Sequence, residues 1–347
     1  MSKKTTRVFV VLSVLLGVGI ILCLGAGNMF VPPDEVLSVL LNKVGINTGI
    51  PFDETNESVV MTLRLPRVLL SILVGAALAV SGVSLQGIFR NPLVDSGLIG
   101  IASGASFFAA LYILLGSAIP FLVAGNPALT LAFVAFLGAA LTTTLVYRIS
   151  RFQQTIQITL LILAGVALNA IAGSLTGLMT FFASDAQLRD LSFWTLGSLG
   201  GATYENLLIL TPFVVIPFLF ILRSGNALNA FALGEQSAYF LGINTSRVKL
   251  IVFLSATAMV GASVSFVGAI GFVGLVIPHI LRAIVGPNHR VLIPLSALAG
   301  ATLLCYSDLI SRTLLSPTEI PIGIITALFG TPVLLIIILR QKKRLFV

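Results

Sequence analysis

The chain has 347 residues, of which 57% are hydrophobic and only 9% are charged, with a mean hydropathy of +1.09 and a net charge of +8. A soluble domain carries about 25% charged residues, so this composition excludes the soluble classes and indicates a membrane protein. A transmembrane β-barrel is disfavoured too, because barrel strands alternate over about 10 residues, whereas the apolar runs here are long and unbroken.

Ten apolar segments follow one another along the chain, and a helix that crosses a bilayer needs roughly 20 such residues. Their predicted cores are residues 8–30, 63–85, 98–120, 127–147, 158–182, 204–222, 248–267, 270–285, 291–311 and 320–339. A further short helix is predicted near 186–200, at the outer surface. We therefore expect an all-α polytopic membrane protein with about ten transmembrane helices, folded as a single membrane domain over residues 1–347.

The distribution of basic residues predicts the orientation of these helices. The first apolar segment is too long for a cleaved signal peptide, and no small-residue cleavage site follows it before Pro32, so it is predicted to be the first span. With the N-terminus inside, 15 of the 20 Lys and Arg residues fall on the cytoplasmic side, as membrane topology favours. Both termini are then cytoplasmic. The positive charge is explained by topology and indicates a lipid bilayer rather than a nucleic acid as the partner.

A spaced motif occurs twice. The run 74–76 (Val-Gly-Ala), Gly82 and Pro92 recur 186 positions later as 260–262, Gly268 and Pro278. Five predicted spans separate the two copies, an odd number, so two halves of about 1–200 and 201–347 would be inverted relative to one another. Inverted repeats are typical of transporters, with the pathway at the interface between the halves.

The residues that carry chemistry are few. No lysine follows the glycine-rich pattern of a phosphate-binding loop, so the chain is not expected to bind ATP, and no cluster typical of a metal site occurs. His279 and His289 are predicted to be packing and loop residues. Two alternatives stay open: an intramembrane enzyme that uses Ser263 with His279, and an ion-coupled carrier. Mid-span charges, which such a carrier usually needs, are almost absent, so the energy is expected to come from outside the chain.

The segment LGEQSAYFLGINTSRVK, residues 233–249, is a polar insert between two apolar runs. Glycines at 234 and 242 permit tight turns, and Glu235 suits the start of a short helix. An ordinary connecting loop would not need Ala238 and Leu241, with the aromatic residues between them, outside the membrane. The segment is therefore predicted to pack against a partner in the cytoplasm.

Several motifs together resemble one family. They are Thr62–Arg67 (TLRLPR), Gln86–Leu93 (QGIFRNPL), Leu233–Gly242 (LGEQSAYFLG), Gly268–His279 (GAIGFVGLVIPH) and Glu319–Gly323 (EIPIG). In this order they resemble the permease subunits of the ATP-binding cassette (ABC) importers for iron siderophores, haem and vitamin B12, from about residue 60 onwards. The resemblance implies the type II ABC importer permease fold and a transport subunit rather than an enzyme.

The same resemblance implies partners and site residues. Two permeases form a homodimer in the bacterial inner membrane, two separate ATP-binding subunits carry ATP and Mg, and a soluble substrate-binding protein delivers the cargo. The ATPase would contact a cytoplasmic coupling loop at 233–246, through Gly234, Glu235, Ala238, Leu241 and Gly242. The binding protein would dock on Arg64, Arg67 and Arg312, since an arginine fork binds carboxylates in bidentate fashion. A cytoplasmic gate would lie at Ile158, Thr159 and Leu160.

The cargo is the least specific expectation. The stretch Asp185–Gly201 (DAQLRDLSFWTLGSLGG) resembles haem permeases most, although siderophore permeases share much of it. Haem is therefore the predicted cargo, with a ferric siderophore or vitamin B12 as the alternative. The mechanism expected from the resemblance is alternating access.

Overall fold

The structure is a computed structural model that describes residues 3–27, 29–47, 49–116, 119, 126–152 and 155–345. Within these residues the chain is helical apart from one two-stranded hairpin, so the all-α prediction is confirmed. Residue 28 of the first predicted segment and residues 117, 118 and 120 of the third lie outside the described residues.

Seven helices in the described part are long and apolar enough to cross a membrane. Six of them are α1 (Lys3–Gly25), α7 (Pro127–Ser150), α8 (Ile158–Phe182), α10 (Tyr204–Arg223), α13 (Thr245–Val267) and α15 (His289–Thr313). The seventh is one continuous helix over Glu54–Phe89, made of α3 (Glu54–Ser58), a π-helical turn (Val59–Arg64) and α4 (Leu65–Phe89). Three shorter apolar stretches are α5 (Ile101–Leu115), α14 (Val273–Val285) and the part Ile322–Ile336 of α16 (Ile322–Leu345). Each of the ten predicted segments overlaps one of these helices, although length alone supports only seven crossings.

Short elements connect the long helices. They are α2 (Pro33–Lys43), a 3₁₀ turn (Ser96–Ile99), β1 (Arg151–Phe152), β2 (Thr155–Ile156), α9 (Asp185–Leu196), α11 (Gly225–Phe231) and α12 (Glu235–Phe240). The predicted short helix near 186–200 corresponds to α9. It starts one residue earlier, because Ser184 and Gln187 form a capping box that fixes its first turn.

Helix α4 lies at the centre of the bundle, and small residues let its neighbours approach its backbone. A Cβ at Gly75 would lie 2.3 Å from Gly300 O on α15, and a Cβ at Gly82 would lie 1.8 Å from Gly274 O on α14. Only glycine fits such contacts, which are typical of packed membrane helices. Helices α1, α8 and α10 are mostly uncovered, so their apolar faces are left for lipid or for another chain.

The structure corrects one sequence pattern. Gly82 lies inside α4, whereas Gly268 caps the end of α13 with a positive φ of 72°. Pro92 follows a helix, but Pro278 lies inside α14. The Val-Gly-Ala runs of both copies lie inside long helices, α4 and α13, but the later positions differ in local structure, because one copy continues through a helix and the other crosses a helix break. The inverted halves themselves stay a prediction.

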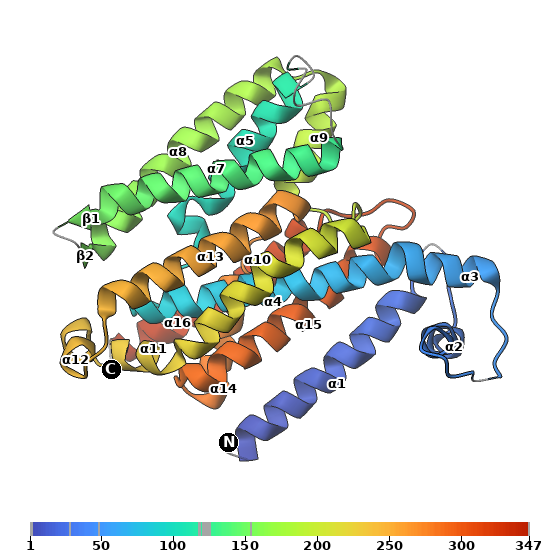
Figure 1. Ribbon diagram of the computed structural model, residues 1–347, viewed down its shortest axis with the longest axis horizontal. Helices are drawn as coiled ribbons and strands as arrows, with labels where there is room; N and C mark the ends of the chain where they lie inside the picture. The colour runs from blue at the N-terminus through green and yellow to red at the C-terminus, as the bar shows by residue number, and fades with distance from the viewer. Residues whose placement is uncertain are drawn as a thin grey trace.

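The bundle has two ends that carry the candidate sites (Figure 1). Helix α12 and the β1–β2 hairpin lie together at the left of the view, and we call this the α12 end. At the opposite end lie α2 and α3, and also Arg64, Arg67, Arg312 and Glu319, which line one cavity. We call this the arginine end.

Candidate coupling and docking sites

The predicted coupling loop forms a helical turn that projects from the α12 end. Helix α11 is followed by Gly234, whose φ of 116° turns the chain into α12. Gly242, with φ of 83°, ends α12, and its N–H donates to Tyr239 O at 2.9 Å. Both glycines therefore hold backbone conformations that other residues rarely adopt, as the sequence predicts for tight turns.

The apolar side chains of α12 face two ways. Leu241 is 63% exposed, Tyr239 66% and Phe240 83%. Ala238 is completely buried, in a small cluster with Ala230, Phe231, Ile243 and Val248. Ala238 therefore fixes α12 to α11 and α13 instead of facing a partner. The surface open to a partner is made by Tyr239, Phe240 and Leu241, of which only Leu241 was among the predicted site residues.

An ion pair that sequence reasoning missed lies behind α12. Lys249 Nζ lies 2.5 Å from Glu235 Oε1, and the lysine side chain is 4% exposed while the glutamate side chain is 42% exposed. Lys249 Nζ also donates to Ile156 O at 3.3 Å. Glu235 is therefore held from the inside by a residue outside the predicted loop 233–246.

The predicted gate residues lie beside this ion pair, in the first turn of α8. Strands β1 and β2 pair antiparallel, with Arg151 opposite Ile156, and the chain then enters α8. Ile158 is half-buried, whereas Thr159 and Leu160 are exposed on the open face of α8. The three residues thus lie at the α12 end, on a helix that the single chain leaves uncovered.

Of the predicted docking residues, Arg64 is buried. Its Nη1 donates to Leu24 O at 2.6 Å and to Gly25 O at 2.8 Å, and its Nη2 donates to Met29 O. These carbonyls lie at the end of α1 and in the connection after it, so Arg64 ties α1 to the start of α4.

Arg67 and Arg312 share a carboxylate. Arg67 Nε donates to Asp308 Oδ1 at 2.9 Å, and Arg312 Nε lies 3.5 Å from Asp308 Oδ2. Arg312 also donates to Cys23 O. The fork of Arg67 holds Glu319 in bidentate fashion, at 2.8 and 2.9 Å. Hydrogen bonding from Arg67 lowers the pKa of Glu319, because the guanidinium stabilises the carboxylate form.

The three arginines do meet, although the chain separates them widely. They line one cavity of about 380 Å³ at the arginine end, together with Gly200 and Glu319. Arg67 is the most exposed of the three, since it is half-buried where Arg64 and Arg312 are buried, and its partner Glu319 has a 43% exposed side chain. The cavity is thus a basic site already occupied by the chain's own carboxylates.

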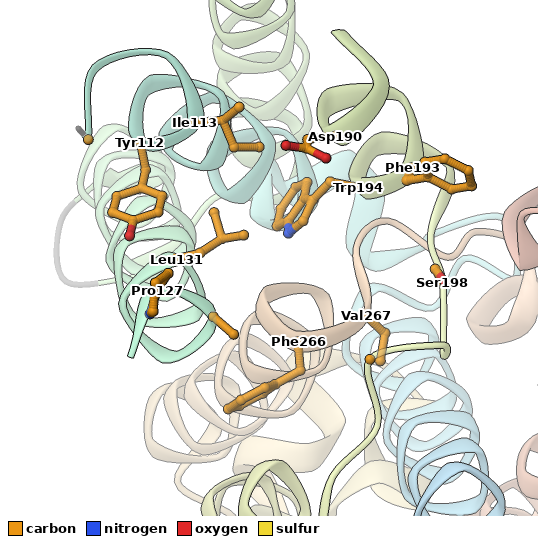
Figure 2. Close-up of a pocket in the computed structure, with 13 residues that line it drawn as sticks. Tyr112, Ile113, Pro127, Leu131, Asp190, Phe193, Trp194, Ser198, Phe266 and Val267 are labelled. Carbon is orange, nitrogen blue, oxygen red and sulfur yellow. The ribbon is translucent and has the colours of Figure 1, made fainter. Parts of the chain in front are cut away.

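A second cavity, of about 570 Å³, lies between α5, α7, α9 and α13 (Figure 2). Four of the 13 lining residues are aromatic, and of these Trp194 points into the cavity. The other aromatic residues that line it are Tyr112, Phe193 and Phe266. Asp190 adds one carboxylate. Five lining residues come from 185–201, the stretch used above to predict the cargo.

The remaining candidates have structural partners. Ser263 Oγ donates to Met259 O in its own helix, and His289 Nδ1 lies 3.1 Å from Asn229 Oδ1. Cys23 and Cys305 are free and buried. Among the described residues, no group of three metal-ligating side chains is found.

A bundle of apolar helices with an exposed polar turn at one end is compatible with a membrane transport permease. A model described as the FecCD transport family matches residues 15–340. The chain is 39% identical to the hemin transport system permease protein HmuU of Yersinia pestis, over 94% of both chains. It is 36% identical to the vitamin B12 import system permease protein BtuC of Klebsiella pneumoniae, over 99% of this chain and 96% of that protein. It is 35% identical to the Fe(3+)-citrate import system permease protein YfmE of Bacillus subtilis, over 99% of both.

A solved ABC transporter of the metal-chelate type, in an inward-facing conformation, has the same fold, with a TM-score of 0.82. The two chains are 32% identical, and the match covers 96% of this chain and 99% of that one. The chain therefore belongs to the FecCD transport family. It is a multi-pass permease subunit of an ABC importer and not an enzyme.

Proposed function

We propose that the chain forms the membrane pathway of an importer that carries an iron-chelate compound, haem first, into the cytoplasm. Two copies line the pathway in the inner membrane. A soluble binding protein docks at the arginine end, two ATP-binding subunits dock at the α12 end, and the pathway alternates between outward and inward access. Both termini and the α12 end are placed in the cytoplasm because most basic residues gather on that side.

The open face of α8 supports the homodimer. Leu163, Ala167, Ala170, Ser174 and Gly177 recur on one exposed face at helical spacing. Nothing lies within 4 Å of a Cβ built at Gly177, so a neighbour has room to approach. Small residues favour close contact between membrane helices. A second copy packed here would bring the two Thr159 residues toward one axis, as a gate requires.

The exposed turn of α12 supports ATPase docking at this end. Phe240 and Tyr239 are large, apolar and uncovered outside the long helices. Such side chains are enriched in the cores of protein interfaces. ATP and Mg are assigned to the partner subunit, since no phosphate-binding loop occurs in this sequence.

The arginine cavity supports docking of the binding protein through carboxylates. Arg67 is the contact residue in this proposal, because it is the most exposed of the three arginines that line the cavity and its partner Glu319 is 43% exposed. Arg64 and Arg312 hold the site in shape through their contacts with α1. A carboxylate from the binding protein would compete with Glu319 for Arg67.

The observation that carries the cargo proposal is the 39% identity with a haem permease over 94% of both chains. The aromatic cavity adds support, because flat apolar groups pack well against aromatic side chains. The B12 and ferric citrate permeases are nearly as similar, so a cobalamin or a ferric siderophore is the alternative cargo.

Side-by-side uptake tests the cargo. The permease, reconstituted with its ATP-binding subunit and binding protein, is given haem, ferric citrate and cobalamin at equal concentrations. Uptake of haem several times faster than uptake of ferric citrate or cobalamin supports the proposal. Faster uptake of ferric citrate or cobalamin overturns haem as the proposed cargo. A Trp194→Ala variant should lower haem uptake, while Phe220→Ala, at an exposed position of α10, serves as the matched aromatic control.

A further inference from the structure

Lys249 lies where three parts of the α12 end meet. It stands near the start of α13, and its Nζ contacts Glu235 Oε1 on α12 at 2.5 Å and Ile156 O on β2 at 3.3 Å. The gap beside its side chain is otherwise apolar, lined by Ile88, Phe89, Ile158, Leu161 and Phe253. One ammonium group therefore connects α12 to the hairpin that leads into α8.

The chain path from Ile156 to the predicted gate is short. Ile156 pairs with Arg151 across the hairpin, and the next residue, Gln157, donates from its N–H to Ser150 O at 2.9 Å. Gln157 is the N-cap of α8, so Thr159 lies in the first turn. Ile156 is thus joined to that turn through Gln157, whose C=O accepts from Leu161 N–H at 3.0 Å inside the same turn.

The ammonium group of Lys249 does more than fill space between the helices. A buried charge is tolerated only when it is paired, and separating the pair leaves an uncompensated charge. An ammonium has three donors, which allows acceptors on two different elements at once. Pulling α12 away from the hairpin would break one contact or the other. An apolar side chain would fill the same space without this penalty.

On α12, the partner of Lys249 in this ion pair lies at a surface that another protein can reach. Glu235 has a 42% exposed side chain, whereas that of Lys249 is 4% exposed. The buried Ala238 packs α12 against the start of α13, near Val248. Helix α12 is therefore fixed to the part of α13 that carries Lys249.

We propose that Lys249 is a positioning residue that transmits displacement of α12 to the first turn of α8. The inference rests on the proposed function, because it assumes that an ATPase moves α12. It extends that function by naming the contact that carries the movement from the coupling turn to the gate.

The test compares Lys249→Met with Arg223→Met in the reconstituted complex with haem as cargo. Arg223 is an exposed basic residue in the last turn of α10, outside the segment 233–249, and serves as the matched control. We expect Lys249→Met to retain ATP hydrolysis within about twofold, while cargo moved per ATP falls by about tenfold. Arg223→Met should keep the wild-type ratio. An unchanged ratio in Lys249→Met, or an equal fall in Arg223→Met, overturns the inference.

Two further measurements separate transmission from a structural role. Spin labels on Thr159→Cys in both copies should change their separation on ATP binding, and this change should be lost when Lys249→Met is added. Retention of the change overturns the inference.

The variant Glu235→Gln is used if Lys249→Met does not assemble, because it keeps an acceptor for the buried ammonium. It should lower the cargo moved per ATP about threefold. An unchanged amount of cargo per ATP in Glu235→Gln contradicts transmission. If the wild-type complex shows no ATP-dependent uptake of haem, ferric citrate or cobalamin, the proposed function itself fails.

Discussion

Arg67 and Asp308 stand 241 positions apart in the chain and meet at the arginine end, where Arg67 Nε donates to Asp308 Oδ1 at 2.9 Å. Asp308 also faces Arg312, and Glu319 holds the outer side of Arg67. Two carboxylates therefore balance two guanidiniums within one network. This network joins the start of α4 to the end of α15 and is the basis of the first three predictions.

Asp308→Asn should destabilise the protein, because Arg67 and Arg312 would lose the charge that compensates them in a buried site. Breaking a buried pair typically costs about 3–5 kcal/mol. Thermal unfolding of the detergent-solubilised protein measures the effect. Asp185→Asn, at an exposed position, is the control, and an equal melting temperature for the two variants would contradict the network's structural role.

Arg67→Glu should weaken docking of the binding protein by roughly tenfold, since a carboxylate would face the incoming carboxylates. The difference between wild type and variant should shrink as salt increases, because salt screens exposed charges. Surface binding assays at low and high salt measure both effects. Arg189→Glu, an exposed arginine on α9, is the control; if it weakens docking as much, the contact is not specific to Arg67.

The Arg67–Glu319 pair predicts a pH dependence. Because the pKa of Glu319 is lowered in the folded state, its stabilising contribution is present above the ordinary glutamate pKa of about 4.3 and is lost as pH falls through the lowered value. The melting temperature of wild type should therefore exceed that of Glu319→Gln at neutral pH. The two should converge in acid below about pH 4. A constant difference across this range would argue against the pair.

At the α12 end, exposed and buried positions should respond differently to a charge. Phe240→Asp should reduce association with the ATP-binding subunit while leaving the permease fold intact, because Phe240 is 83% exposed. Ala238→Asp should instead lower stability, since a carboxylate would enter the buried cluster. Pull-down and thermal unfolding distinguish the two. Normal ATPase association in Phe240→Asp would exclude this turn as the docking surface.

Gly82→Ala should disrupt the bundle, because the added Cβ would lie 1.8 Å from Gly274 O and α14 would have to move away from α4. Overpacking of this kind typically costs about 1–3 kcal/mol. Gly17→Ala is the matched control, since a Cβ there meets nothing within 4 Å. Equal stability of the two variants would show that α4 and α14 are not in close contact.

The sequence predicts features that depend on local pattern. The apolar runs predict where the helices lie, and Gly234 and Gly242 predict the turns around α12, because composition and backbone freedom are local properties. Burial of Arg64 was not predictable, since its partners come from a distant segment, the end of α1. Burial of Ala238 depends on how α11 and α13 fold back on α12, which residue spacing alone does not give.

The same limit explains the missed contact at Lys249. Its partner Ile156 is 93 positions away, in a hairpin too short to leave a periodic pattern. The later positions of the motif repeat differ in structure for a related reason. Spacing in the sequence cannot distinguish Gly82, which packs inside a helix, from Gly268, which ends one.

ATP-dependent haem uptake into vesicles tests the central claim most directly. The permease is reconstituted with its ATP-binding subunit. Haem-loaded binding protein is added on the opposite side of the membrane, at the arginine end. The account predicts accumulation that requires ATP and is abolished when the ATP-binding subunit is omitted or carries an inactive phosphate-binding loop. Equal uptake by the permease alone, driven by an ion gradient, would contradict it.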